Sequence, residues 1–229
     1  MDLPVLYADA QVLVVNKPTG VLAAPGGGPE QRYPHVPGLL QPQWGPLWVV
    51  QRLDRLASGA LLLARTPQAR RALGQAFEAG QVAWIFHALV RGNPAWGERV
   101  VDLPLRVNVG RRKRSVPDPR RGQPARTALR VIERFGSHAL VEARPLTRRR
   151  HQVRAHLFAV GHPVVGDPLY GPGPLPEDPL PHLALHARRL VFPGPHTGHW
   201  HKVTAPYPST WAAALDALQW EKALVDDDA

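Results

Sequence analysis

The apolar residues of this chain come in short runs, and turn-forming residues interrupt them. Runs at residues 5–7, 12–15, 60–64 and 82–90 have the length of β-strands, and the 20 glycines and 26 prolines of the sequence separate many of them. No run approaches the roughly 18 to 20 consecutive apolar residues that a membrane-spanning helix needs. We therefore expect a core that is built largely from strands.

The same patterns predict further elements. Strands are expected at residues 127–132, 138–143, 183–187, 190–192 and 202–205. Helices are expected from the N-cap Thr66 to Gly80, and at 149–160 and 210–224, whereas the Gly- and Pro-rich residues 25–46 are expected to form an irregular loop. Strands without a regular βαβ alternation indicate an α+β fold with a mixed, mostly antiparallel central sheet and flanking helices and loops.

The length of 229 residues fits a single domain over residues 1–229, with a frayed acidic tail at 225–229. The first residues lack the basic and then apolar layout of a signal peptide, so we expect a cytoplasmic protein. With no cysteine in the sequence, disulfides, thiolate chemistry and Cys-ligated metal sites are excluded. A monomer is the default expectation.

Positive charge is concentrated in one part of the sequence. Residues 106–154 contain fifteen Lys and Arg residues and three acids, and fifteen minus three gives +12, more than the +10 of the whole chain. This clustering predicts a polyanionic partner with a local footprint, and the planar fork of arginine suits phosphate. A genome rich in G and C also favours arginine codons, which explains arginine over lysine but leaves the clustering unexplained.

One acidic residue lies between two arginines just before a buried strand. Arg52-Leu53-Asp54-Arg55 precedes the apolar run at 60–64. Nearby positive charge favours the ionised form of the Asp54 carboxylate. A surface ion pair explains the same residues, and at this point both interpretations stay open.

Two later segments combine histidine and arginine with apolar residues. In His151-Gln152-Val153-Arg154, the predicted helix would place Arg150 and Arg154 one turn apart, where they could bind a phosphate or a buried acid. The other segment, His182-Leu183-Ala184-Leu185-His186-Ala187, has the pattern of a strand.

Together these segments resemble the RluA-like family of RNA pseudouridine synthases. The opening Lys17-Pro18 and the stretch Gly166-Asp167 resemble further family elements, and all the matching pieces occur in the family's order. The resemblance implies a pseudouridine synthase fold, an isomerase that needs no cofactor and no metal ion, and structured rRNA or tRNA as the partner. Because few residues precede Val5, we expect no S4-type RNA-binding domain of the kind that some relatives carry.

The resemblance also implies roles for individual residues. Asp54 would be the catalytic carboxylate, and Arg154 would pair with it and keep it ionised. Arg52 would fill the base stack when the target nucleotide swings out. The substrate or base contacts would be Arg52, Arg55, Phe86 and Leu185, and the candidate RNA-binding residues are Arg111, Arg112, Lys113, Arg114, Arg148, Arg149 and Arg150.

Some residues depart from the family pattern and keep alternatives open. Phe86 replaces a tyrosine and lacks its hydroxyl, while Gln51 and Ala57 replace a histidine and a threonine beside Asp54. The alternative function is a catalytically weak or inactive RNA-binding or assembly factor with the same fold. A metal site is also considered because five histidines lie between residues 182 and 201, and a glycosidase would need Glu142 or Asp167 as a second carboxylate.

Overall fold

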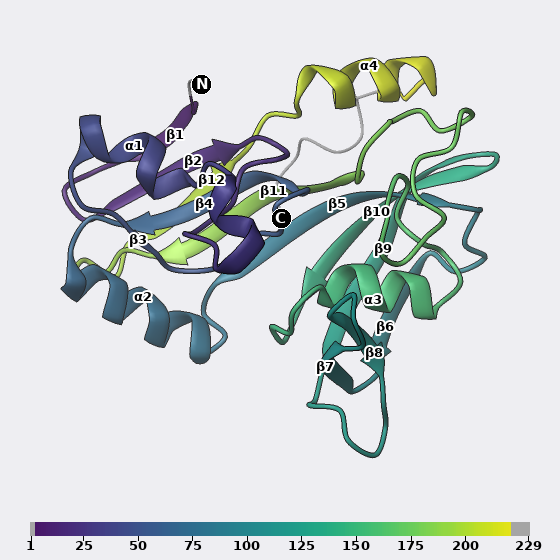
Figure 1. The fold of residues 1–229 in the computed structure, drawn as a ribbon, viewed down its shortest axis with the longest axis horizontal. Coiled ribbons are helices and arrows are strands. Elements are labelled where there is room, and N and C mark those ends of the chain that lie inside the picture. Colours follow the sequence, from purple (N-terminus) through teal and green to yellow (C-terminus); the bar gives the residue numbers. More distant parts are fainter. Residues whose placement is uncertain (1–2, 221–229) are drawn as a thin grey trace. The chain divides into compact units, whose positions relative to one another are not determined.

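The computed structural model describes residues 3–220, which form two compact units. Unit 1 consists of Met1–Ile85 and His186–Pro206, and unit 2 consists of Phe86–Leu185 and Tyr207–Ala229. Figure 1 shows the elements of each unit. The expectation of a single domain over residues 1–229 stays a prediction. The expected tail at 225–229 and the end of the last expected helix lie outside the described residues.

The strands of unit 1 surround one fully buried strand. The hairpin of β1 (Val5–Ala8) and β2 (Val12–Lys17) is antiparallel, as expected, and β2 continues antiparallel to β4 (Ser58–Ala64). All seven residues of β4 are buried. The start of β4 pairs parallel with β11 (Leu185–Pro193), its end pairs with β3 (Trp48–Val49), and β12 (Trp200–Thr204) lies along β11.

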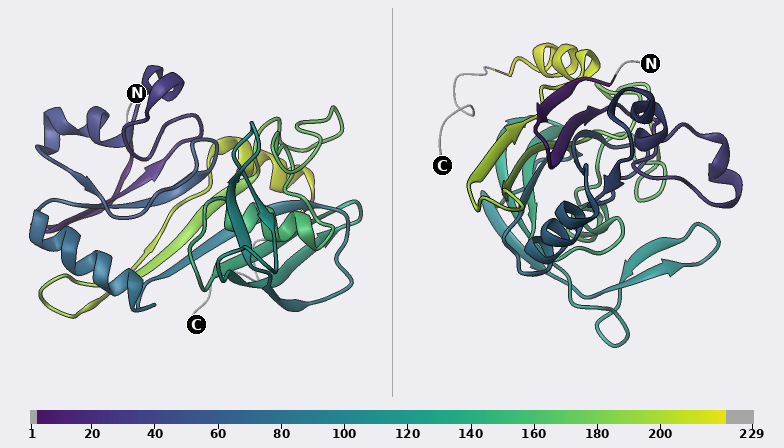
Figure 2. Two further views of the ribbon diagram at one scale, coloured as in Figure 1. Left: turned by 60° about the horizontal axis from the view of Figure 1, so that its bottom comes forward. Right: turned by 90° about the vertical axis from the view of Figure 1, so that its left-hand side faces the viewer.

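The helix after β4 forms as its sequence predicts. In α2 (Pro67–Glu78), the Thr66 hydroxyl accepts a hydrogen bond from the Ala69 amide at 3.1 Å, so the N-cap is confirmed. Leu73 and Phe77 are buried on the side that packs against β3 and β4. Figure 2 shows α2 running alongside these strands.

The expectation of an irregular loop at residues 25–46 was wrong over much of its length. A 3-10 helix covers Gly28–Arg32 (η1), and α1 covers Val36–Trp44. The His35 side chain caps α1 by accepting a hydrogen bond from the Gly38 amide at 2.9 Å. Pro37 occupies the first turn, where no backbone N–H is needed. Proline content alone therefore misidentified this segment.

Unit 2 contains an antiparallel arrangement in the order β5 (Ala83–Arg91), β10 (His138–Pro145), β9 (Arg126–Phe135) and β6 (Glu98–Asp102). A separate hairpin is formed by β7 (Leu105–Val109) and β8 (Arg114–Pro117). The predicted α+β fold with a mixed, mostly antiparallel sheet is confirmed. Strands β3, β6, β7 and β8 were not predicted, because each is only two to five residues long.

Both helices of unit 2 are shorter than expected. Helix α3 (Gln152–Ala159) packs against β8, β9 and β10, and it begins after His151, whose φ of 54° is left-handed. Arg150 therefore lies before the helix, and its expected place one turn from Arg154 on a common face was wrong. Helix α4 (Ser209–Ala217) ends before Gln219, which has a φ of 57°. No helix within residues 3–220 is long and apolar enough to cross a bilayer.

Candidate active site

Asp54 lies on a turn in unit 1 between β3 and β4. The Ala57 amide donates a hydrogen bond to the Asp54 carbonyl oxygen at 3.1 Å and closes this turn. Leu53 and Ala57 are buried on either side, whereas Asp54 is partly exposed and Arg52 is exposed. The apolar neighbours thus fix the backbone, while part of the Asp54 surface stays exposed.

A buried lysine holds this turn from within. The Lys17 side chain is 0% exposed, and its ammonium group donates hydrogen bonds to the carbonyl oxygens of Pro18 at 2.9 Å, Val21 at 2.9 Å and Arg55 at 3.2 Å. Burial lowers the pKa of Lys17 to about 7, and attraction to Asp54 acts in the opposite direction. Sequence reasoning missed this role, although a lysine at the end of an apolar strand was a signal for it.

Further contacts fix the backbone around Asp54. The Gly20 amide donates to the Arg55 carbonyl oxygen at 2.8 Å, and the Thr19 hydroxyl donates to that of Leu56 at 2.8 Å. Gly59 has a φ of 110°, and a Cβ atom there would lie 2.3 Å from the Ala187 carbonyl oxygen, so only glycine fits. The start of β4 is therefore held closely against β11.

The arginines that flank Asp54 differ in their surroundings. Arg52 is exposed. The guanidinium carbon of Arg55 lies 4.2 Å from the centre of the Tyr33 ring, in a cation–π contact. Both expected substrate-contacting arginines of unit 1 therefore lie beside the Asp54 turn.

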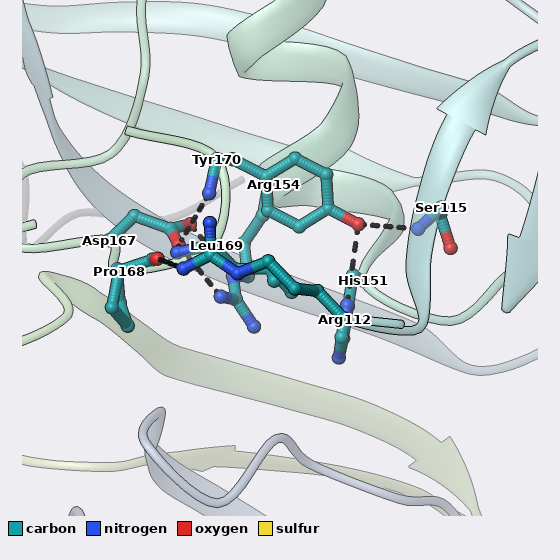
Figure 3. A network of polar contacts seen from close by, with 8 residues as sticks. All are labelled: Arg112, Ser115, His151, Arg154, Asp167, Pro168, Leu169 and Tyr170. Carbon is teal, nitrogen blue, oxygen red and sulfur yellow. Dashed lines mark hydrogen bonds and ion pairs between the residues drawn. The ribbon is translucent and has the colours of Figure 1, made fainter. Parts of the chain in front are cut away.

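Arg154 forms a buried ion pair in unit 2. Its Nε and Nη2 atoms donate to the two carboxylate oxygens of Asp167 at 2.8 and 2.7 Å, and the side chains are 5% and 0% exposed. Asp167 also accepts hydrogen bonds from the amides of Leu169 and Tyr170, so its second role is to close a turn. Figure 3 shows these contacts. The expected pairing of Arg154 with Asp54 joins residues of different units and stays a prediction.

Tyr170 connects three segments of unit 2. Its hydroxyl oxygen accepts a hydrogen bond from the Ser115 amide at 2.7 Å and lies 3.3 Å from Nδ1 of His151 (Figure 3). Ser115 lies where the β7–β8 register shifts, since Arg106 pairs with Val116 but Val109 pairs with Arg114. This register shift is a β-bulge. At the bulge, the Ser115 amide bonds to Tyr170, which lies outside the hairpin. The β7–β8 hairpin is thereby attached to α3 and to the Asp167 turn.

The candidate RNA-binding residues lie in two neighbouring segments of unit 2. Arg111, Arg112 and Lys113 are exposed in the loop between β7 and β8, which Figure 1 shows extending from the strands. Arg148 and Arg150 are exposed before α3, and the Ser115 hydroxyl donates to the Arg150 carbonyl oxygen. The other two candidates, Arg114 and Arg149, are less exposed. Arg114 contacts the Tyr170 ring, and Arg149 donates to the Pro124 carbonyl oxygen at 3.0 Å.

A family model described as RNA pseudouridylate synthase matches residues 11–159. The chain belongs to the RNA pseudouridine synthase family. The family that the sequence motifs indicated is thus confirmed.

Named relatives match most of this chain. It is 35% identical to ribosomal large subunit pseudouridine synthase D of Nitrosomonas europaea over 96% of its own length and 66% of that protein. It is also 35% identical to the dual-specificity RNA pseudouridine synthase RluA of Escherichia coli K12. This match covers 89% of this chain and 93% of that protein. The chain therefore spans just under two thirds of the first relative and nearly all of the second.

Two solved human structures share the fold of this family member. RNA Pseudouridylate Synthase Domain Containing 4 has a TM-score of 0.76 at 26% identity, covering 95% of this chain and 94% of that one. RNA Pseudouridylate Synthase Domain Containing 1 has a TM-score of 0.75 at 28% identity, with 95% of both chains covered.

The remaining candidates of this family member lie in unit 2. Phe86 on β5 is 5% exposed and Leu185 is 3% exposed, so both are apolar and buried, and their expected contact with uracil stays a prediction. Glu142, a candidate second carboxylate, lies 3.2 Å from the Arg130 guanidinium and 3.9 Å from the His87 ring, within the sheet. Among residues 3–220, no three His, Asp or Glu side chains are grouped as metal ligands.

Proposed function

We propose that this chain isomerises uridine to pseudouridine in structured rRNA or tRNA, with Asp54 as its catalytic carboxylate and without a cofactor or a metal ion. The observation that carries the proposal is the partly exposed Asp54 on a turn that the buried Lys17 holds. Family membership supports the reaction class. Among the relatives, one is named for the large ribosomal subunit and another for dual specificity.

The reaction rearranges the substrate and consumes nothing else. The bond between C1′ and N1 of the nucleotide breaks, the uracil turns, and C5 forms a new bond to C1′. The proton on C5 then leaves and N1 gains one, so atoms and electrons balance without a co-reactant. Asp54 either attacks C1′ or removes a proton from C2′, and both routes require an ionised carboxylate. Lys17, when it carries its proton, attracts the Asp54 carboxylate.

The arginines of both units have separate proposed tasks. Arg52 is exposed next to Asp54, where it can occupy the place of the extruded nucleotide. Extrusion costs a few kcal/mol, roughly, and phosphate contacts of residues 111–114 and 148–150 would help to supply this energy. We also propose that Arg154 pairs with Asp54, and that Arg55, Phe86 and Leu185 contact the nucleotide. A monomeric state and a cytoplasmic location stay predictions.

The test maps pseudouridine at single-nucleotide resolution in cells that carry the wild-type chain, Asp54→Asn or Asp54→Ala. Both variants should lose the same sites, because general base or nucleophilic catalysis by one carboxylate contributes about 10² to 10⁴ in rate. The control Asp216→Asn changes an exposed carboxylate on α4 and should keep every site. Unchanged modification in Asp54→Ala, with a defect in ribosomes or tRNA, would instead identify an RNA-binding factor.

A further inference from the structure

Tyr33 contacts two arginine side chains in unit 1. The guanidinium carbon of Arg55 is 4.2 Å from the centre of its ring, and that of Arg32 is 5.0 Å away. Arg32 also donates a hydrogen bond from Nη2 to the Tyr33 hydroxyl oxygen at 3.1 Å. Two cations thus contact one partly exposed aromatic ring. One of them, Arg55, directly follows Asp54 in the sequence.

The backbone at residues 20–22 is hydrogen-bonded both to the segment that carries Tyr33 and to the segment that carries Arg55. The Leu22 amide donates to the Pro34 carbonyl oxygen at 2.9 Å, and the Val36 amide donates to that of Leu22 at 2.9 Å. Two residues earlier, the Gly20 amide donates to the Arg55 carbonyl oxygen at 2.8 Å. The backbones that carry Tyr33 and Arg55 are therefore held in place before any ligand binds, which reduces the entropy lost on binding.

The arginines around Tyr33 and Asp54 are not held in ion pairs. Within the described residues, Arg32, Arg52 and Arg55 form no ion pair with a carboxylate. The hydrogen bond from Arg32, followed by the charges of Arg32 and Arg55, lowers the pKa of the Tyr33 phenol, against smaller opposing effects of burial and of the Glu30 charge. Two guanidinium groups around one ring repel each other, and an anion bound between them would relieve this repulsion.

We propose that Arg55, held by Tyr33, and Arg32 form a binding site for a phosphodiester group of the RNA beside the target uridine. The planar guanidinium donates two parallel hydrogen bonds to phosphate oxygens, and stacking on an aromatic ring keeps it in a fixed orientation. In this site Tyr33 is a positioning residue. The inference rests on the proposed function, because it requires RNA to bind next to Asp54.

This site would also offset an electrostatic repulsion in the proposed reaction. The Asp54 carboxylate repels the phosphates of the nucleotide on which it acts. Arg55 is its neighbour in sequence, and a phosphate bound by Arg55 and Arg32 would be neutralised while the ribose approaches Asp54. The energy gained there would be available to hold an extruded nucleotide.

The test measures binding of fluorescent single-stranded decauridylate by anisotropy at several KCl concentrations. Tyr33→Leu should bind on the order of tenfold more weakly because it loses the cation–π contact, whereas Tyr33→Phe keeps the ring and should stay within about twofold of wild type. Arg32→Gln removes an exposed cation and should reduce the slope of log affinity against log salt by about 0.7, the value for one phosphate of a single strand. An unchanged affinity and salt slope in Tyr33→Leu and Arg32→Gln would overturn the inference.

Two further measurements separate this inference from its alternatives. Inorganic phosphate, added at constant ionic strength, should leave the wild-type affinity for decauridylate unchanged; displacement as large as the effect of Tyr33→Leu would mean a site for a free anion. On RNA that wild type modifies, Tyr33→Leu should raise KM and leave kcat within about twofold. A chain that forms no pseudouridine would contradict the proposed function, while the binding data would still decide the phosphate site.

Discussion

The guanidinium group of Arg154 forms two hydrogen bonds with the carboxylate of Asp167, at 2.8 and 2.7 Å, and both side chains are buried. The two residues are thirteen positions apart, on α3 and on the turn before Tyr170. The pair fixes the orientation of Arg154, because a buried guanidinium in a two-point contact has little freedom to rotate.

Asp167→Asn should destabilise the chain by about 3–5 kcal/mol, because it removes the negative charge of a buried ion pair and leaves the Arg154 charge less well compensated. The double variant Arg154→Met with Asp167→Leu should cost much less, since it removes both charges together. Urea denaturation of the three proteins measures these differences. Equal losses in the single and double variants would contradict the ion pair as the source of the effect.

Tyr170→Phe should loosen the β7–β8 hairpin, because it removes only the hydroxyl that accepts the Ser115 amide. Ser115 is fully buried, so an unpaired amide there costs roughly 1–3 kcal/mol. Hydrogen exchange of the Ser115 amide should become faster. The control Tyr7→Phe removes a hydroxyl in unit 1 and should leave this amide unchanged. Protection of Ser115 that persists in Tyr170→Phe would show that the hairpin is held by other contacts.

Lys17 should make stability depend on pH above neutrality. Its pKa is about 7 in the folded chain and 10.5 ordinarily, so between these values the unfolded chain binds a proton that the folded chain lacks. The free energy of unfolding should therefore rise with pH across this window, and Lys17→Met should remove that rise. Urea denaturation at pH 6.5, 8 and 9.5 measures the difference between the two proteins. A constant difference would show that Lys17 keeps its ordinary pKa.

Glu142 should contribute stability that acid removes. The imidazole of His87 and then the guanidinium of Arg130 lower its pKa from 4.5 to about 2, against the opposing effect of burial. Its stabilising effect is present above pH 4.5 and is lost as pH falls through 2. The advantage of wild type over Glu142→Gln should therefore be larger at pH 6 than at pH 3 in denaturation experiments. Exposed Glu98→Gln serves as the control, and an equal advantage at both pH values would refute the role of Glu142.

Local patterns in the sequence were enough to predict much of the fold. The β1–β2 hairpin, β4 and the capped helix α2 each depend on residues close together in the chain. Asp54 was found in the same way, because its arginine neighbours and the apolar run after it form one short motif. The rule that proline disfavours helices failed for α1. Its Pro37 lies in the first turn, where no backbone N–H is needed.

The sequence by itself determined many of the strands, the family and the acid on which the proposed chemistry depends. Only the tertiary structure decided that Asp167 pairs with Arg154, that Tyr33 stacks on Arg55 and that Lys17 is buried beneath the Asp54 turn. Backbone propensity and apolar spacing act between chain neighbours, whereas charges and rings pair with whatever the folded chain places beside them. The partners of a site therefore emerge from the packing of distant segments.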